Sequence, residues 1–252
     1  MSIRGDLRLE DAIEQLYGVF KRYGAENMTG TCDGGYEEEA RFLGATRIER
    51  LQPGDLSRFA FRALTTWGSF DEFKHFLPRL LEIAATLPVV ERGVWTDFEI
   101  LMGKLAYGEW EKWPRRERDA VREYLHSLWA ELLIRFPFQI DVDRCLCGIA
   151  RAEEDVSHYL DAWDEARTVV ALRHFSEFLD DNVFTLLRNE RLANAYWDDR
   201  DEQVRQVVRW LVDPAAIASR QQMLVDILSP VDGEVASRCF DQLQTIKERF
   251  CT

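Results

Sequence analysis

The chain is organised around residues 65–82, TTWGSFDEFKHFLPRLLE. Gly68 can adopt the positive φ that ends one helix, and Ser69 or Asp71 can cap the next one. The apolar residues that follow are spaced three and four apart and share one helix face: Phe70, Phe73, Phe76, Leu77, Leu80 and Leu81. Because Pro78 lacks a backbone N–H, the sequence predicts a kink or local opening inside this second helix.

The same helical spacing of apolar residues recurs along most of the chain. Roughly nine to eleven helices are predicted, over residues 11–23, 37–43, 56–67, 69–87, 96–107, 115–136, 164–188, 201–212, 213–228 and 229–250. Thr96, Asp213 and Ser229 are the expected caps of three of them. Residues 141–159 are less regular, and residues 164–188 fit one long helix or two with a break near 180–182. Alternating apolar runs of the kind that form strands are absent.

These patterns predict an all-α protein. The first interpretation is an irregular helical array or α-solenoid, and the alternative is a compact multi-helix bundle. Residues 118–122 and 201–205 each open a helix with acidic residues, then Val-Arg and an apolar stripe, which resembles the second helix of HEAT-like repeats. We expect one domain, 1–252, with a soft boundary near 137–141.

The formal net charge of −13 is concentrated in residues 153–202, which hold 14 Asp and Glu against five Arg and no Lys. Such a surface repels nucleic acid and anionic membranes and attracts basic partners. Within it we expect the contact residues to be Asp198, Asp199, Asp201 and Glu202. The alternative is that the charge only keeps the surface solvated.

Cysteine usage and the start of the chain indicate a reducing, cytoplasmic setting. The five Cys are an odd number, and residues 1–10 are charged and lack the apolar core of a signal peptide. No apolar run reaches the length of a membrane span. Cys145 and Cys147 face different ways on a helix, so we expect free thiols there, and Cys32 lies in a Gly-rich loop with no adjacent base.

Three of the four His follow a carboxylate by three residues, a spacing that puts both side chains on one helix face. Two such pairs on facing helices are half of a carboxylate-bridged di-metal site. The weak candidate ligands are Glu72, His75, Glu123, His126, Asp155 and His158. The competing interpretation is ordinary acid–base pairs on helix surfaces, and we expect no metal and no cofactor.

Lys74, His75 and Arg79 form the most distinctive polar set, with Trp67 on the preceding turn. Their functional interpretation is a cationic pocket for an anionic ligand or an acidic residue of a partner. The structural interpretation is that these side chains satisfy backbone groups near Pro78, or that Arg79 pairs with Glu82. The second interpretation is favoured, because buried polar networks usually serve packing.

Residues 63–68, ALTTWG, and 73–82, FKHFLPRLLE, resemble a group of functionally uncharacterised bacterial proteins with a Thr-Trp-Gly turn and a Lys-His-Phe-Leu-Pro-Arg helix. The resemblance covers only these two segments and implies no activity. It departs from the group's pattern at Cys32-Asp33-Gly34-Gly35, where a Cys-x-x-Cys pair is expected. A metal held there in the group would lack its ligands here.

The absence of catalytic motifs favours binding over catalysis. We expect a cytoplasmic protein whose acidic surface binds a basic protein partner, in the sharpest form a bacterial immunity or adaptor protein that covers a toxin domain. One alternative is an enzyme or metal-binding protein centred on His75, Lys74 and Arg79. Another is a structural subunit of a larger complex.

Overall fold

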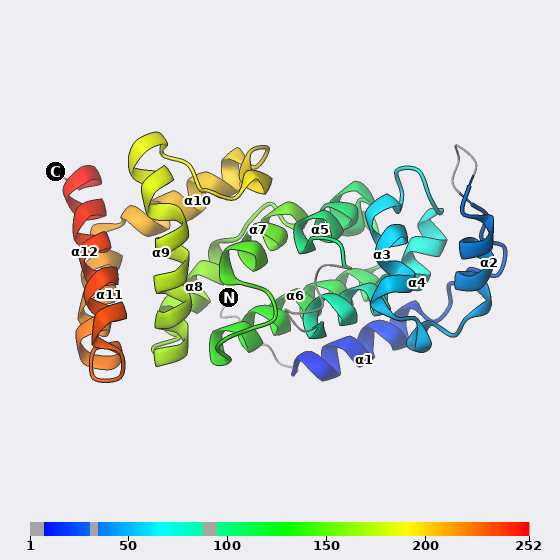
Figure 1. Ribbon diagram of the computed structural model, residues 1–252, viewed down its shortest axis with the longest axis horizontal. Helices are drawn as coiled ribbons and strands as arrows, with labels where there is room; N and C mark the ends of the chain where they lie inside the picture. The colour runs from blue at the N-terminus through cyan, green and yellow to red at the C-terminus, as the bar shows by residue number, and fades with distance from the viewer. Residues whose placement is uncertain (1–7, 31–34, 88–94, 252) are drawn as a thin grey trace. The chain divides into compact units, whose positions relative to one another are not determined.

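The computed structural model describes residues 8–30, 35–87 and 95–251 (Figure 1). These residues form twelve α-helices and no β-strand, which confirms the prediction of an all-α helical array. The first six helices are α1 (Leu9–Phe20), α2 (Glu37–Ala45), α3 (Pro53–Arg62), α4 (Phe70–Thr86), α5 (Phe98–Tyr107) and α6 (Arg115–Ile134). The others are α7 (Val142–Ala152), α8 (Ser157–Glu165), α9 (Val169–Asn189), α10 (Asp201–Val212), α11 (Pro214–Met223) and α12 (Gly233–Phe250).

Short helical turns join some of these elements. Three are 3₁₀ turns, η1 (Ile48–Arg50), η3 (Trp110–Lys112) and η4 (Ala195–Trp197), and the π-helical segment η5 (Leu224–Leu228) extends α11. Within the described ranges, none of the helices combines the length and the apolar character needed to cross a membrane.

The chain divides into two compact units. Among the described residues, the N-terminal unit extends to Leu128 and the C-terminal unit begins at Trp129. The division falls inside α6, whereas the sequence placed a soft boundary near 137–141. The prediction of one domain, and the choice between solenoid and bundle, stay predictions.

The turn before α4 has the predicted conformation and cap, but α3 ends at Arg62 rather than at residue 67, so Gly68 shapes the turn and does not end a helix. Gly68 has a φ of +76°, and Ser69 caps α4 by accepting a hydrogen bond from the Glu72 backbone N–H at 3.3 Å. The Glu72 carboxylate accepts one in return from the Ser69 N–H at 2.6 Å, which completes a capping box. Helix α4 continues through Pro78 without a break, and the alternative of a kink there stays a prediction.

Aromatic side chains form the core of the N-terminal unit. Phe59 on α3 packs edge-on against Phe76 of α4, with ring centroids 4.9 Å apart, and against Trp67 at 5.7 Å. Phe20 of α1 and Phe73 of α4 both contact Trp113, at 6.0 and 6.4 Å. The apolar face predicted for residues 70–81 therefore holds α1, α3 and α4 together, although Phe70 itself is 52% exposed.

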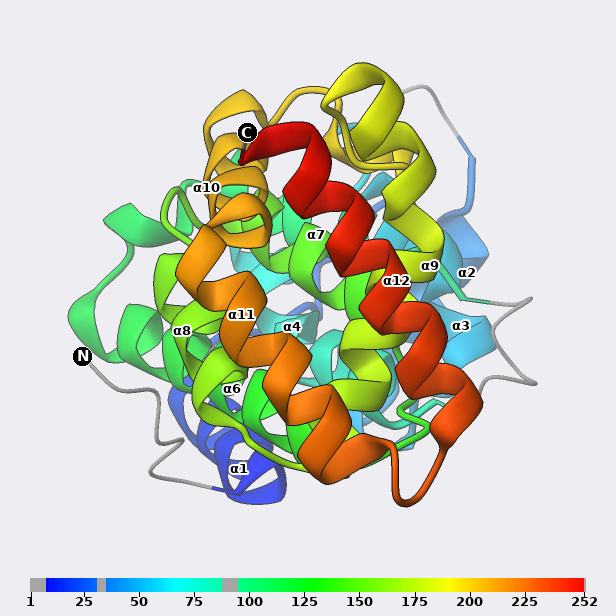
Figure 2. The ribbon, with the colours of Figure 1, turned by 90° about the vertical axis from the view of Figure 1, so that its left-hand side faces the viewer.

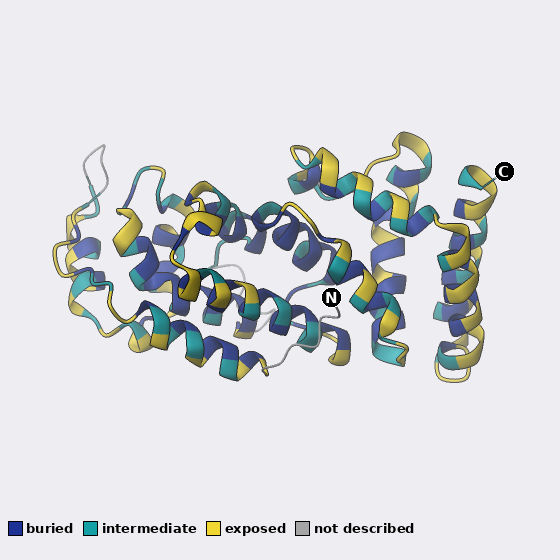
Figure 3. Ribbon diagram, turned by 180° about the vertical axis from the view of Figure 1, so that it is seen from behind, coloured by how far each residue is buried: buried dark blue, intermediate teal, exposed yellow. Residues whose placement is uncertain are grey.

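Trp163 on α8 lies at the centre of the C-terminal core. The rings of Trp129, Phe175, Phe178 and Trp210 surround it, with centroids 5.3 to 5.9 Å from that of Trp163. Helix α12 packs against α9 and α11, and Figures 1 and 2 show these helices side by side. Figure 3 shows buried and exposed residues sharing most helices, as amphipathic helices require.

A buried guanidinium closes this core. Arg220 of α11 is 2% exposed and donates to both carboxylate oxygens of Asp164 at 2.9 Å. A third donor reaches the backbone carbonyl of Trp210 at 3.0 Å, and the guanidinium lies over the Trp210 ring at 4.0 Å. The planar, permanently charged guanidinium suits this combination of forked pairing and stacking.

The structure defines the helices in a stretch that the sequence left irregular and moves two predicted helix caps. Residues 141–159 form α7 and the start of α8, with Asp141 capping α7 through the Arg144 N–H at 2.8 Å. Helix α5 begins at Phe98, with Asp97 rather than Thr96 at the cap position. Helix α12 begins at Gly233 and is capped by Asp232, so the Ser229 prediction is wrong because η5 extends to Leu228.

The long pattern over residues 164–188 belongs in part to α9, which runs unbroken through residues 180–182. Asn182 is buried there, and its amide nitrogen donates to Asp143 and to the Phe178 carbonyl, each at 3.0 Å. Its carbonyl oxygen accepts from the Ala193 N–H at 2.7 Å. A polar residue that resembled a helix break thus serves as an internal link.

Candidate functional site

The predicted acidic contact residues lie at the start of α10 in the C-terminal unit. Asp198, Asp199, Asp201 and Glu202 are all exposed. The neighbouring Trp197 is buried, and its indole N–H donates to Asp143 at 3.3 Å. One side of this short segment is therefore anchored in the core while its acidic side chains face solvent.

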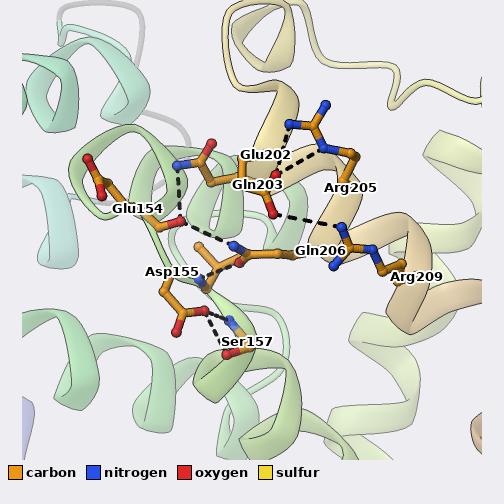
Figure 4. Close-up of polar contacts among 9 residues, drawn as sticks. Glu154, Asp155, Ser157, Glu202, Gln203, Arg205, Gln206 and Arg209 are labelled. Carbon is orange, nitrogen blue, oxygen red and sulfur yellow. Dashed lines mark hydrogen bonds and ion pairs between the residues drawn. The ribbon is translucent and has the colours of Figure 1, made fainter.

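Two glutamines of α10 hold the turn between α7 and α8 beside this segment (Figure 4). The Gln203 amide donates to the carbonyls of Glu153 and Glu154, each at 3.2 Å. Gln206 donates to the Glu154 carbonyl at 3.2 Å and accepts from the Val156 N–H at 2.8 Å. These contacts fix the backbone of the turn beside α10, and the side chains of Glu154 and Asp155 on this turn are exposed.

We call the resulting region the α10 acidic surface, and its six exposed members are Glu154, Asp155, Asp198, Asp199, Asp201 and Glu202. The hydrogen bond from Arg205 lowers the pKa of Glu202 below its ordinary value, and hydrogen bonds from Ser157 lower the pKa of Asp155. Partial burial opposes ionisation of Asp199, but Arg151 still lowers its pKa. These three carboxylates are therefore anionic at neutral pH.

Local arginines neutralise part of this charge. Glu202 pairs with Arg205 at 2.8 Å and lies 3.8 Å from Arg209 (Figure 4). Arg151 donates to Asp199 at 2.7 Å and to the Tyr196 carbonyl at 2.8 Å. Glu154, Asp198 and Asp201 make no ion pair within the described ranges, so no nearby cation offsets their contribution to the field of the surface.

Other acids of residues 153–202 have partners from outside that window. Asp164 pairs with Arg220, and Asp180 accepts from Arg238 at 2.8 and 2.9 Å. Part of the acidic excess read from the sequence is therefore neutralised in three dimensions by arginines from outside residues 153–202. The arginines responsible lie on α11 and α12, far from their partners in the sequence.

The second predicted set, Trp67, Lys74, His75 and Arg79, lies in the N-terminal unit and makes contacts between elements. Trp67 is buried, and its indole N–H donates to the Thr29 carbonyl at 3.0 Å. The Nδ1 atom of His75 lies 2.8 Å from the Tyr23 carbonyl. Arg79 donates to the Leu51 carbonyl at 2.9 Å and, as predicted, pairs with Glu82 at 2.7 Å.

Lys74 belongs to a buried polar cluster at the junction of α4 and α6. Its ammonium group pairs with Glu117 at 2.9 Å and lies over the Trp113 ring at 4.3 Å. Glu117 is 1% exposed and also accepts from Tyr23 at 2.7 Å and from Arg22. A buried carboxylate that accepts two hydrogen bonds on one oxygen and faces a paired ammonium on the other is typical of a structural polar cluster, and these contacts support the structural interpretation.

The candidate metal ligands are not assembled. Glu72 completes the capping box of α4, and Asp155 accepts from the Ser157 hydroxyl at 2.6 Å. The Nε2 atom of His158 lies 3.6 Å from the carboxylate of Glu153, which is not the partner, Asp155, that the spacing predicts. Glu123 and His126 share α6. In the part of the chain described here, no three His, Cys, Asp or Glu side chains converge as metal ligands.

The thiols give no reactive site among the described residues. Cys145 and Cys147 are both buried free cysteines on α7. Burial raises the pKa of the Cys239 thiol to about 12, so this thiol stays protonated and unreactive. Cys32 lies outside the described residues, as do Asp33 and Gly34.

Two polar groups with unusual surroundings were not found from the sequence. Arg220 is one of many arginines, and nothing in its neighbours indicates that it is buried. Asp143 is 5% exposed, and burial raises the pKa of its carboxyl to about 6, although Asn182, Asn194 and Trp197 donate to it. In both cases the environment comes from other helices, so local spacing carries no signal.

Comparisons of the chain with protein-family models, with curated proteins and with solved structures found no significant match. The resemblance of residues 63–68 and 73–82 to an uncharacterised bacterial group therefore stays a prediction.

Proposed function

We propose that this chain is a protein-binding helical protein whose α10 acidic surface recognises a basic partner. In its sharpest form the proposal is a bacterial immunity or adaptor protein that covers a basic toxin domain. The observation that carries it is the presence of six exposed carboxylates, four at the start of α10 and two on the turn that Gln203 and Gln206 fasten to this helix.

A fixed acidic surface favours association in two physical ways. The summed field of several carboxylates raises the rate at which a basic surface encounters it. Because the frame is already ordered, little conformational entropy is lost when a partner binds. Arg205 and Arg209 lie at the edge of the surface, where they repel wrongly placed basic groups and so help to select orientation.

The proposal is tested with a triple variant, Glu154→Gln, Asp198→Asn and Asp201→Asn. These side chains are exposed and hold no ion pair in the described ranges, so the fold should be kept. Partners are captured from native lysate with the wild-type chain at about 50 and 500 mM salt, where attraction between exposed charges differs strongly. We expect a basic partner that the triple variant fails to capture and that high salt releases.

A matched control carries the same charge change elsewhere, in Glu14→Gln, Glu38→Gln and Glu111→Gln, which are exposed positions of the N-terminal unit. This control should capture the partner as the wild type does. Equal capture by the wild type and the Glu154/Asp198/Asp201 variant, or capture that is insensitive to salt, contradicts the proposal.

The alternative with chemistry centred on His75 is less well supported, because Lys74, His75 and Arg79 are each engaged with another element. A His75→Ala variant discriminates between the two interpretations. Lower stability with partner capture intact supports a structural role, whereas unchanged stability with loss of an activity supports chemistry.

A further inference from the structure

The N-terminal unit contains an open hollow of about 730 Å³ that none of the predicted sites uses. Its apolar lining comes from three helices and the segment before α5: Phe42 of α2, Phe61 of α3, Trp95, and Ile100 of α5. This volume is large enough to take one or two bulky side chains. All the lining residues belong to one unit, so the hollow does not depend on the other.

Two phenylalanines in this hollow are unusually exposed. Phe42 is 49% exposed and Phe61 is 57% exposed, and they are two of the eight large apolar side chains with high exposure among the described residues. By contrast Phe59, two residues before Phe61 on the same helix, is fully buried in the core. Clustered exposed aromatic rings around a concavity are typical of protein-binding sites.

The charge around the hollow is negative. Three carboxylates line it, Glu39, Asp55 and Asp97, against one cation, Arg58. Arg58 is already paired with Glu39. Asp55 lines the hollow and also accepts a hydrogen bond from the Gln52 backbone N–H at 2.8 Å. An apolar floor with an acidic rim complements a segment that carries both apolar and basic side chains.

The wall also holds polar groups that lack partners among the described residues. The indole N–H of Trp95 and the hydroxyl of Thr96 are buried, and neither makes a hydrogen bond there. Buried donors of this kind are normally satisfied.

We infer that this hollow is a second protein-binding site, separate from the α10 acidic surface. Its occupant is an amphipathic helical segment of a partner protein, which inserts a bulky apolar side chain between Phe42 and Phe61. A Lys or Arg within one helical turn of that anchor faces Asp55 and Asp97. This recognition follows the helix-in-groove mode, in which a few anchor residues supply most of the affinity.

The occupant is tested by selecting a randomised display library of short peptides on the full chain. Peptides that also bind a Phe42→Ser, Phe61→Ser double variant are removed. Both positions are exposed, so the double variant should fold as the wild type does. We expect enriched peptides with an aromatic or branched aliphatic residue next to Lys or Arg in helical spacing, and at least tenfold weaker binding of each to the double variant by fluorescence anisotropy.

Two controls separate this site from others. Phe184→Ser removes a phenylalanine that is 67% exposed on α9 of the other unit, and it should leave peptide binding unchanged. The Glu154/Asp198/Asp201 variant should also leave it unchanged, so the two proposals can fail independently. The inference is overturned if selection yields nothing above the double variant, if the peptides are acidic or lack an apolar anchor, or if Phe184→Ser weakens binding equally.

Discussion

Asp143 shows how a single residue can make the stability of this chain depend on pH. Its carboxyl is buried between α7 and α9, and it accepts hydrogen bonds from Asn182 at 3.0 Å and Trp197 at 3.3 Å. Burial outweighs these bonds and raises its pKa from 3.8 to about 6. Between these values the folded state still holds a proton that the unfolded chain has released. The stability contributed by this group therefore falls as pH rises from about 4 to 6 and is constant above that range.

We predict that Asp143→Asn removes this dependence. The amide keeps the acceptor oxygen but cannot ionise, so the free energy of unfolding of the wild type should fall relative to the variant by about 2 kcal/mol between pH 4 and pH 7. Urea titrations of both proteins at several pH values measure this difference, in which the effects of other titrating groups cancel. A difference that does not change with pH would show that Asp143 titrates normally.

At the scale of one element, α4 depends on the turn that precedes it. Gly68 has a φ of +76°, and a Cβ at this position would lie 2.8 Å from the Phe59 ring. Other residues adopt this φ only with strain, and the Phe59 ring is fixed in the core by Phe76 and Trp67. The turn therefore needs glycine for two separate reasons, its backbone conformation and its close approach to α3.

We predict that Gly68→Ala lowers the free energy of unfolding by about 2 kcal/mol, from backbone strain and the contact with Phe59. The matched control is Gly18→Ala on α1, where a Cβ meets nothing within 4 Å. That change should raise stability by about 0.5 to 1 kcal/mol, because alanine favours the helix. Denaturant midpoints of the two variants test this, and a loss of similar size in both would refute the special role of Gly68.

The capping signals explain which helices could be predicted and which could not. Ser69 and Asp213 cap the expected helices, because Ser69 precedes an amphipathic pattern and Asp213 precedes a proline that suits the first helical turn. Ser229-Pro230 has the same form, yet η5 extends the preceding helix up to it and the cap moves to Asp232. The sequence placed Cys145 and Cys147 on a helix but did not define where that helix begins and ends, which the structure gives as Val142–Ala152.

At the scale of the whole chain, the total charge follows from the sequence alone, whereas the distribution of that charge depends on the fold. The value of −13 holds whatever the fold. Its distribution does not, because Arg220 and Arg238 neutralise Asp164 and Asp180 across long stretches of sequence. The six carboxylates of the α10 acidic surface could be placed only in part, since the contribution of Glu154 depends on its contact with Gln203 and Gln206.

We predict that the chain is stabilised by moderate salt at neutral pH. Self-repulsion from the net charge is screened, and most of the ion pairs that salt also weakens are exposed and contribute little. Between about 10 and 300 mM sodium chloride we expect a gain near 1 kcal/mol, or about 2 to 4 °C in the unfolding midpoint. Calorimetry at pH 7 measures it. Near the isoelectric point of 4.9 the gain should vanish, and a midpoint that falls with salt at pH 7 would mean that ion pairs dominate.

The hydrogen bonds from Gln203 and Gln206 to the turn between α7 and α8 affect how the proposed partner would dissociate. These hydrogen bonds join neutral side-chain amides to main-chain carbonyls and to one main-chain N–H group. Neither ionic strength nor mild acid therefore weakens them. Salt or mild acid can therefore weaken the electrostatic attraction at the α10 acidic surface without changing the conformation of this turn. The proposed partner would then dissociate and rebind without local unfolding and refolding of this turn in between.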